Sequence, residues 1–208
     1  MLTSLRDLVF TPACIGCGEL GLHLCPMCLT SCLPQESNDV PGVAKVIAAS
    51  AYGGWLRDAL VDYKNGSRRR VYGLAQVLQR AMLMHVDLDS VTVVPMPSSS
   101  AKIAARGFDT INLLARECMK LQSPAYGEVS PVLYSSREVA DQVGLSAKQR
   151  EQNVARSMAA RRAVTGTVLV VDDVITTGST MGEAARVLRL AGARNVFGIS
   201  LCGSTKWA

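Results

Sequence analysis

One segment, residues 168–180, constrains the fold of this chain more than any other part of it. It begins with four apolar residues (168–171), which predict a strand buried on both faces, as in a parallel sheet. Asp172 and Asp173 follow, and a run of Thr, Gly and Ser then leads into a helical pattern. A second apolar run, residues 196–201, predicts the next strand. The sequence therefore predicts a β-loop-α-β unit of an α/β fold.

The residues of the loop favour a particular kind of ligand. The N-terminus of a helix offers unpaired N–H groups and a partial positive charge, which suit a phosphate group. Gly178 lets the backbone approach a ligand closely, and the hydroxyl groups on either side can donate further hydrogen bonds. The carboxylates just before the loop are hydrogen-bond acceptors, which suit the vicinal hydroxyls of a sugar. Together these groups predict a site for a ribose-5-phosphate.

Four other interpretations of the segment fit less well. A P-loop needs the pattern Gly-x-x-x-x-Gly-Lys-Ser/Thr, which the chain lacks, and a dinucleotide-binding loop has three glycines where this loop has one. A signalling receiver domain also has an acidic pair after a strand, but most of that domain follows the pair, and here only residues 173–208 follow Asp172. A purely structural role, in which Asp173 and Thr176 only start a helix, explains the polar residues but not the acidic pair.

The segment resembles the phosphoribosyl pyrophosphate motif of type I phosphoribosyltransferases. The resemblance implies the fold of that family, an α/β fold with a mainly parallel sheet flanked by helices. It also implies that Asp172 and Asp173 hold the ribose 2′ and 3′ hydroxyls, as candidate catalytic residues. The 5′-phosphate would be held by the loop residues Thr176, Thr177, Gly178, Ser179 and Thr180.

The N-terminal part of the chain carries a dense group of cysteines. Five of the seven cysteines lie within residues 14–32, and four of them form two Cys-x-x-Cys pairs separated by seven residues. In a reducing compartment, clustered cysteines indicate metal or redox chemistry rather than disulfides, and two pairs this close favour a structural zinc site. A redox Cys-x-x-Cys motif is the alternative. The expected zinc ligands are Cys14, Cys17, Cys25 and Cys28.

The expected zinc site also predicts how the chain is divided. Four protein ligands would leave no open coordination position, so the zinc would be structural, and the segment around it would depend on the metal to fold. Cys32 is a fifth thiol whose role stays open, and His23 could replace a cysteine as a ligand, although a bystander role fits it better. We expect a zinc-ribbon-like segment over residues 1–36, a linker over residues 33–42 and a phosphoribosyltransferase-like domain over residues 43–208.

Composition is compatible with this division. The chain of 208 residues is 49% apolar, which is enough for one α/β domain with a small appendage. Its net charge of +5 suits a protein that binds phosphorylated ligands, and it permits contact with nucleic acid. No apolar run approaches transmembrane length and the N-terminus lacks a signal-peptide pattern, so we expect no membrane segment and a cytoplasmic location.

Apolar periodicity predicts the remaining elements. A first strand is expected over residues 43–52, and helices over residues 55–60, 71–86 and 109–121. The basic run of residues 64–70 lies between two of these helices. It is either a solvated surface or the flank of a polyphosphate site, and the sequence favours neither.

A second strand and the turn after it predict where a pyrophosphate would bind. Residues 91–94 are expected to form a strand that ends in a Pro- and Ser-rich turn with cations behind it, an arrangement that suits a pyrophosphate. Residues 133–150 are a long polar stretch, typical of a functional lid or a disordered connection. The residues expected to contact pyrophosphate are Lys64, Pro97, Ser98, Arg106, Arg137 and Arg150.

Several motifs occur along the chain in an order that resembles the pattern of one protein family. They are the cysteine pairs, Pro95-x-Pro97 with Arg106-Gly107-Phe108, the run Gln142…Arg150…Asn153, and the loop of residues 172–180. Together they span nearly the whole chain and resemble the ComF family, the competence-associated phosphoribosyltransferase-like proteins. The chain departs from that pattern at Asp109-Thr110, where Asn-Gln is common, at Met158, where Phe is usual, and at residues 98–100, where a more basic stretch is usual.

The resemblance leaves three functions open. The chain could be an enzyme that displaces pyrophosphate from phosphoribosyl pyrophosphate with Mg²⁺ bound mainly through substrate oxygens. It could instead be a non-catalytic module that binds a competence helicase and single-stranded DNA during DNA uptake. The third candidate is a phosphoribosyltransferase of nucleotide salvage, which would need a base-binding hood. The acceptor and the oligomeric state stay open.

Overall fold

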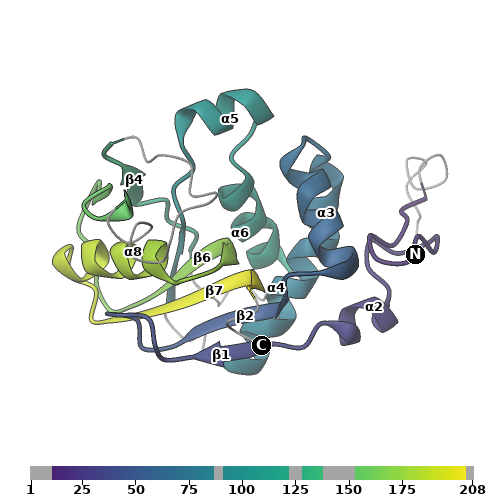
Figure 1. Ribbon diagram of the computed structural model, residues 1–208, viewed down its shortest axis with the longest axis horizontal. Helices are drawn as coiled ribbons and strands as arrows, with labels where there is room; N and C mark the ends of the chain where they lie inside the picture. The colour runs from purple at the N-terminus through teal and green to yellow at the C-terminus, as the bar shows by residue number, and fades with distance from the viewer. Residues whose placement is uncertain (1–10, 87–90, 122–127, 138–152, 205–208) are drawn as a thin grey trace.

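The computed structural model describes residues 11–86, 91–121, 128–137 and 153–204. Arg150 and Gln142, which the sequence analysis places in a pyrophosphate site and a family motif, lie outside these residues. The described residues form a mixed α/β fold with a mostly parallel sheet flanked by helices (Figure 1), which confirms the fold class at that level. None of the described helices is long and apolar enough to cross a bilayer.

The main sheet has five strands in the order β1-β2-β7-β6-β3. Strand β1 pairs with β2 in antiparallel fashion, and the other neighbouring strands are parallel. A separate antiparallel pair, β4 and β5, joins two segments on either side of residues 138–152. The strands are β1 Gln35–Ser37, β2 Val46–Ala51, β3 Val91–Pro95, β4 Leu133–Ser135, β5 Met158–Ala160, β6 Thr167–Ile175 and β7 Asn195–Gly203.

Helices cover both faces of the sheet (Figure 1). Helices α4 and α6 pack against each other and against one face, whereas α8 contacts β6 and β7 from the other face. Residues 168–171 of β6 are fully buried between these layers, as expected of a central parallel strand. The helices are α2 Pro26–Ser31, α3 Gly54–Lys64, η1 Arg68–Arg70 (a 3₁₀-helix), α4 Val71–His85, α5 Ser100–Arg106, α6 Thr110–Lys120 and α8 Ser179–Leu190.

Two expectations about elements were wrong in detail, and one helix was missed. Strand β6 continues past residue 171, so that Asp172 and Asp173 lie in its last part rather than after it. Helix α5 was not predicted, because its seven residues have no buried side and therefore no apolar periodicity. The linker interpretation of residues 33–42 fails at β1, a polar edge strand that pairs with β2. It is held by the ion pair of Glu36 with Lys45 and by a contact of Glu36 with His85 Nδ1.

The cysteine-rich segment packs directly on the domain rather than standing apart from it. Ile15 lies over Gly73 of α4, where a Cβ atom would come within 2.6 Å of Ile15 Cδ1. Arg80 of α4 donates from Nη1 to the carbonyl oxygens of Leu29 and Cys32, at 3.3 and 2.7 Å. Because the last carbonyls of a short helix lack partners within it, Arg80 completes the end of α2 and fixes it to α4.

Candidate functional site

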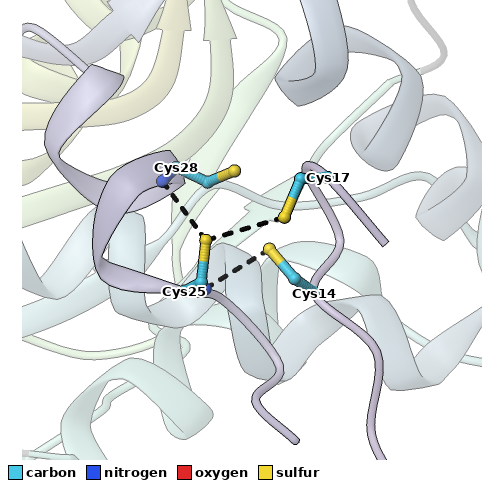
Figure 2. A group of neighbouring side chains, drawn as sticks. All are labelled: Cys14, Cys17, Cys25 and Cys28. Atoms are coloured by element: carbon cyan, nitrogen blue, oxygen red, sulfur yellow. Dashed lines mark hydrogen bonds between the residues drawn. The ribbon is translucent and has the colours of Figure 1, made fainter. Parts of the chain in front are cut away.

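The four cysteines of the two Cys-x-x-Cys pairs form one cluster (Figure 2). Cys14 and Cys17 lie in the loop before α2, Cys25 caps the N-terminus of α2, and Cys28 lies within it. Their sulfur atoms all lie within 4.8 Å of one another, and Cys17 and Cys25 Sγ are 3.7 Å apart. Tetrahedral zinc with Zn–S bonds of about 2.3 Å places its sulfurs about 3.8 Å apart. The donor set therefore fits a structural zinc ion.

The backbone around the cluster is arranged for thiolates. The N–H of Cys25 donates to Cys14 Sγ at 3.3 Å, and a Cβ at Gly16 would come within 2.6 Å of Cys28 Sγ. Burial opposes ionisation of Cys14, but N–H groups of Cys17, Cys25 and Gly16 bring its pKa down to about 6. Burial and the neighbouring thiols raise the pKa of Cys28. A divalent cation would remove this conflict, because it stabilises all of its thiolate ligands together.

Neither His23 nor Cys32 belongs to the cluster. The ring of His23 lies 4.8 Å from that of Tyr72, and burial, with Arg69 nearby, lowers its pKa. Cys32 is buried, and its thiol lies 3.7 Å from the carbonyl oxygen of Cys28. Within the described ranges, the only group of Cys, His or acidic residues placed to hold a metal is that of the four cysteines. His23 therefore lies outside the group of the four cysteines.

The acidic pair and the loop after it lie at the carboxyl edge of the parallel sheet, where open α/β sheets bind ligands. Gly178 has a φ of +77°, and a Cβ there would come within 2.5 Å of Val40 Cγ2. The hydroxyls of Thr177 and Ser179 lie 2.8 Å apart. Because Ser179 is the first residue of α8, the hydroxyls of the loop and the N–H groups at the start of the helix lie at the same carboxyl edge of the sheet as Asp172 and Asp173.

A lysine reaches the acidic pair from α3. Lys64 Nζ lies 2.7 Å from Asp173 Oδ2, with only 28% and 17% of the two side chains exposed. Asp172 accepts the N–H of Asp173 at 2.8 Å. Burial and the adjacent Asp173 carboxylate raise the pKa of Asp172 to about 7, against the opposing effects of that N–H, of Lys64 and of Lys102. The pair therefore carries unfavourable charge, and such charge is characteristic of ligand sites.

The residues expected to contact pyrophosphate are divided between two hollows. The larger hollow, of about 1050 Å³, is lined by Pro97, Ser98, Arg137 and Thr180, among others. The smaller one, of about 390 Å³, is lined by Lys64 and Arg106. Arg137 donates to the backbone oxygens of Asn153 and Ala155 at 2.7 and 2.9 Å, so part of its donor capacity is used to hold the segment before β5.

One cation near the acidic pair was missed as a candidate contact. Lys102 lies on α5, lines the larger hollow and lowers the pKa of Asp172. It stands four residues before Arg106, so the two are neighbours on one helix face. The spacing would have indicated this pair if α5 had been recognised as a helix.

Replacement of Asp172 by Asn is expected to stabilise the protein at pH 7.5 by about 1 kcal/mol or more. The folded state binds a proton at Asp172 that the unfolded chain releases near pH 4, so wild-type stability falls as pH rises from about 4 to about 7. The amide introduced by Asp172→Asn would keep an acceptor for the Asp173 N–H without the charge. Urea unfolding at pH 5 and pH 8 measures the effect. Equal pH dependence in wild type and D172N would contradict it.

Replacement of Gly178 by Ala is expected to destabilise the protein by about 2–5 kcal/mol, because left-handed strain and a clash with Val40 add together. In the background of Val40→Ala the clash is gone, and the same change should cost about 1–2 kcal/mol. Gly182→Ala, within α8, is the matched control and should not destabilise. Thermal unfolding of the wild type, Gly178→Ala, Val40→Ala, their double variant and Gly182→Ala gives the coupling free energy between positions 40 and 178. If the effects of Gly178→Ala and Val40→Ala on stability simply add, Val40 does not clash with a Cβ at position 178.

Comparison with known proteins finds similar named proteins, of which two are described here, whereas no protein-family model matches the chain. The chain is 33% identical over 111 residues to the DNA utilization protein YhgH of Salmonella typhi. The aligned residues are 53% of this chain and 48% of that protein. It is 31% identical over 111 residues to competence protein F of Haemophilus influenzae, covering 50% of this chain and 46% of that protein. The matches thus span about half the length of each relative. Together with the ordered motifs, they support the assignment of this chain to the ComF family.

Proposed function

We propose that this chain binds phosphoribosyl pyrophosphate, or a related ribose-5-phosphate, and that it acts in connection with DNA uptake. The observation that carries the proposal is the acidic pair at the end of β6, directly before a glycine- and hydroxyl-rich loop that opens α8. Asp172 and Asp173 would accept hydrogen bonds from the ribose hydroxyls. The loop residues that would hold the 5′-phosphate are Thr176, Thr177, Gly178, Ser179 and Thr180.

We also propose which fold family the chain has and how the chain is divided into two parts. The parallel strands β2, β7, β6 and β3, with ligand loops at their carboxyl edge, agree with a type I phosphoribosyltransferase fold. Residues 1–36 would form the metal-binding segment and residues 43–208 the ligand-binding domain. Strand β1 would then be an edge strand that the segment adds to the sheet of the domain.

The residues around the acidic pair suggest how pyrophosphate would be held. In an enzyme of this kind negative charge grows on the leaving pyrophosphate, and fixed cations stabilise it. Lys64 and Arg106 line one hollow, whereas Pro97, Ser98 and Lys102 line the other. Mg²⁺, when bound, would neutralise phosphate oxygens. Lys64 would exchange its contact with Asp173 for a phosphate oxygen, which would leave Asp173 available to a ribose hydroxyl.

The names of the relatives refer to DNA utilization and competence, and they are compatible with a second candidate function. This candidate is a non-catalytic module that binds single-stranded DNA or a helicase during DNA uptake. The basic helix η1 would belong to that surface, although Arg70 already pairs with Asp62 and Arg68 lies 5.0 Å from the centre of the Phe108 ring. Affinity for single-stranded DNA that falls steeply with salt would favour this function. Turnover of phosphoribosyl pyrophosphate with a nucleobase would favour nucleotide salvage instead.

A series of ligand fragments tests the proposal. We expect phosphoribosyl pyrophosphate with Mg²⁺ to raise the melting temperature most, ribose-5-phosphate to raise it less, and ribose alone to leave it unchanged, because the loop recognises the phosphate. Each compound would be added at millimolar concentration and the melting temperature measured by thermal shift. Equal responses to ribose and ribose-5-phosphate, or no response to any compound, would contradict the proposal.

A further inference from the structure

The smaller hollow lies between the C-terminal ends of two helices. Lys64 is the last residue of α3 and Arg106 is the last residue of α5, and both line the hollow together with Asn65, Gly66 and Ala105. Among the described residues, this lining contains two cations and no carboxylate. Two cations on different helices hold one anion well only if the helix ends are kept at a fixed separation. A residue that connects the two helix ends would therefore shape the anion site.

Thr110, the first residue of α6, contacts both of these helix ends. Its hydroxyl oxygen lies 3.4 Å from Arg106 Nη1, which donates to it. Its carbonyl oxygen accepts a hydrogen bond of 2.8 Å from the hydroxyl of Tyr63, the residue before Lys64 in α3. Thr110 is 1% exposed, and it belongs to the lining of neither hollow. This one buried residue thus joins the two cationic walls of the smaller hollow without lining it.

The connection through Tyr63 is a firm one. Tyr63 is 1% exposed, and its ring centre lies 5.4 Å from that of Phe108, two residues after Arg106. Burial, with Asp109 nearby, raises the pKa of Tyr63, so its hydroxyl keeps the proton that it donates to Thr110. Because a buried donor that loses its acceptor is costly, this hydrogen bond is retained. The end of α3 is therefore fixed to the start of α6.

The connection through Arg106 leaves its charge available. Helix α5 has no buried residue, so its packing does little to orient the long side chain of Arg106. The hydroxyl of Thr110 takes one of the five N–H donors of the guanidinium and leaves four for a ligand. Because this hydroxyl is neutral, it orients the guanidinium without cancelling its charge, as a carboxylate would do. A phosphate group then meets a cation that is already in place.

We infer that Thr110 is a positioning residue, which holds Arg106 and the end of α3 so that Arg106 and Lys64 bind a pyrophosphate group together. That this group belongs to phosphoribosyl pyrophosphate rests on the proposed function. The role of Thr110 toward Arg106 requires only that the smaller hollow binds pyrophosphate, so free pyrophosphate is the probe that separates the two.

Calorimetric titration of the full chain with inorganic pyrophosphate and Mg²⁺ tests the inference. Thr110→Val keeps the shape of the side chain and removes the acceptor, so affinity should fall about fivefold or more. Thr110→Ser keeps the hydroxyl and should bind within about twofold of the wild type. Thr92→Val is the matched control, because it makes the same chemical change at a partly buried position near the start of β3. Unchanged affinity in Thr110→Val would overturn the inference.

A double-mutant cycle with Arg106→Lys shows whether Thr110 acts through Arg106. The ammonium of a lysine keeps the positive charge but has no planar group for a single acceptor to orient. In the background of Arg106→Lys, Thr110→Val should therefore change pyrophosphate affinity by less than about twofold. A role of Thr110 in the fold alone would give the same loss of affinity in both backgrounds, and that result would overturn the inference.

The outcomes distinguish this inference from the proposed function. In the double variant Asp172→Asn with Asp173→Asn, pyrophosphate should bind at least as tightly as in the wild type, because Lys64 loses its carboxylate partner. A wild type that binds pyrophosphate but not phosphoribosyl pyrophosphate would contradict the proposed function and leave the role of Thr110 in place. A wild type that binds phosphoribosyl pyrophosphate but not pyrophosphate would overturn the inference alone.

Discussion

Removal of the zinc ion that the four cysteines are proposed to hold is expected to unfold the N-terminal segment and to lower the stability of the whole chain. The four thiols lie within 4.8 Å of one another, and two of them, Cys14 and Cys25, are buried. Without a cation, thiolates so close repel one another, and the segment has little apolar surface of its own to hold it together. Structural zinc contributes about 10–16 kcal/mol of apparent binding free energy in small zinc domains, and that energy is folding energy.

Metal analysis and thermal unfolding measure this prediction. We expect about one zinc per chain in protein purified under reducing conditions, and a melting temperature at least about 10 °C lower after chelation or in Cys25→Ser. The loss of stability should extend into the rest of the chain, because Ile15 packs over Gly73 and Arg80 holds the end of α2. Cys118→Ala, which changes a buried cysteine outside the cluster, should keep its zinc. Zinc-free, fully folded protein with a Cys-x-x-Cys disulfide would favour the redox alternative.

Replacement of both Asp172 and Asp173 by Asn is expected to weaken binding of phosphoribosyl pyrophosphate at least about 100-fold. Each carboxylate would accept a charge-assisted hydrogen bond from a ribose hydroxyl, worth about 1.5–3 kcal/mol. The fold should survive, because the amide side chains keep hydrogen-bond acceptors and the charge at the carboxyl end of β6 is removed. Asp58→Asn on α3 is the matched control, since Asp58 is exposed and pairs only with its neighbour Arg57 among the described contacts.

If the double variant loses affinity for phosphoribosyl pyrophosphate but keeps its stability, the acidic pair serves ligand binding rather than the fold. The pKa of Asp172 is raised to about 7 by burial and by Asp173, so the pair lowers stability when it is ionised. Replacing a residue that only supports the fold usually lowers the stability of the protein. A double variant that is at least as stable as the wild type and fails to bind ligand would mark the pair as a site that the protein keeps at the expense of stability.

Local patterns in the sequence predicted the central part of the fold. Residues 168–171 form a continuous apolar run because a middle parallel strand is buried on both faces, and this alone indicated β6. Gly178 was predicted to let the backbone approach a ligand closely, and the structure adds that it has a positive φ at the start of α8. The spacing of the four cysteines was sufficient to predict that they form one cluster, because metal ligands must meet at one point. The structure brings the four together.

Features that depend on contacts between distant residues could not be predicted. The close approach of Val40 to Gly178 and the ion pair of Lys64 with Asp173 join segments far apart in the sequence. Strand β1 has no apolar alternation because it is a short edge strand, and its partner β2 supplies its hydrogen bonds. Helix α5 has no buried residue, so no periodic apolar signal marked it.

The most direct test of the central claim is calorimetric titration of the wild type with phosphoribosyl pyrophosphate, with and without Mg²⁺, beside the double Asp→Asn variant and Asp58→Asn. We predict saturable binding that strengthens with Mg²⁺, persists in Asp58→Asn and is lost in the double variant. Equal binding by the wild type and a folded double variant would contradict the role of the acidic pair. No binding by the wild type in either condition would contradict the phosphoribosyl ligand itself and direct the search to DNA and protein partners.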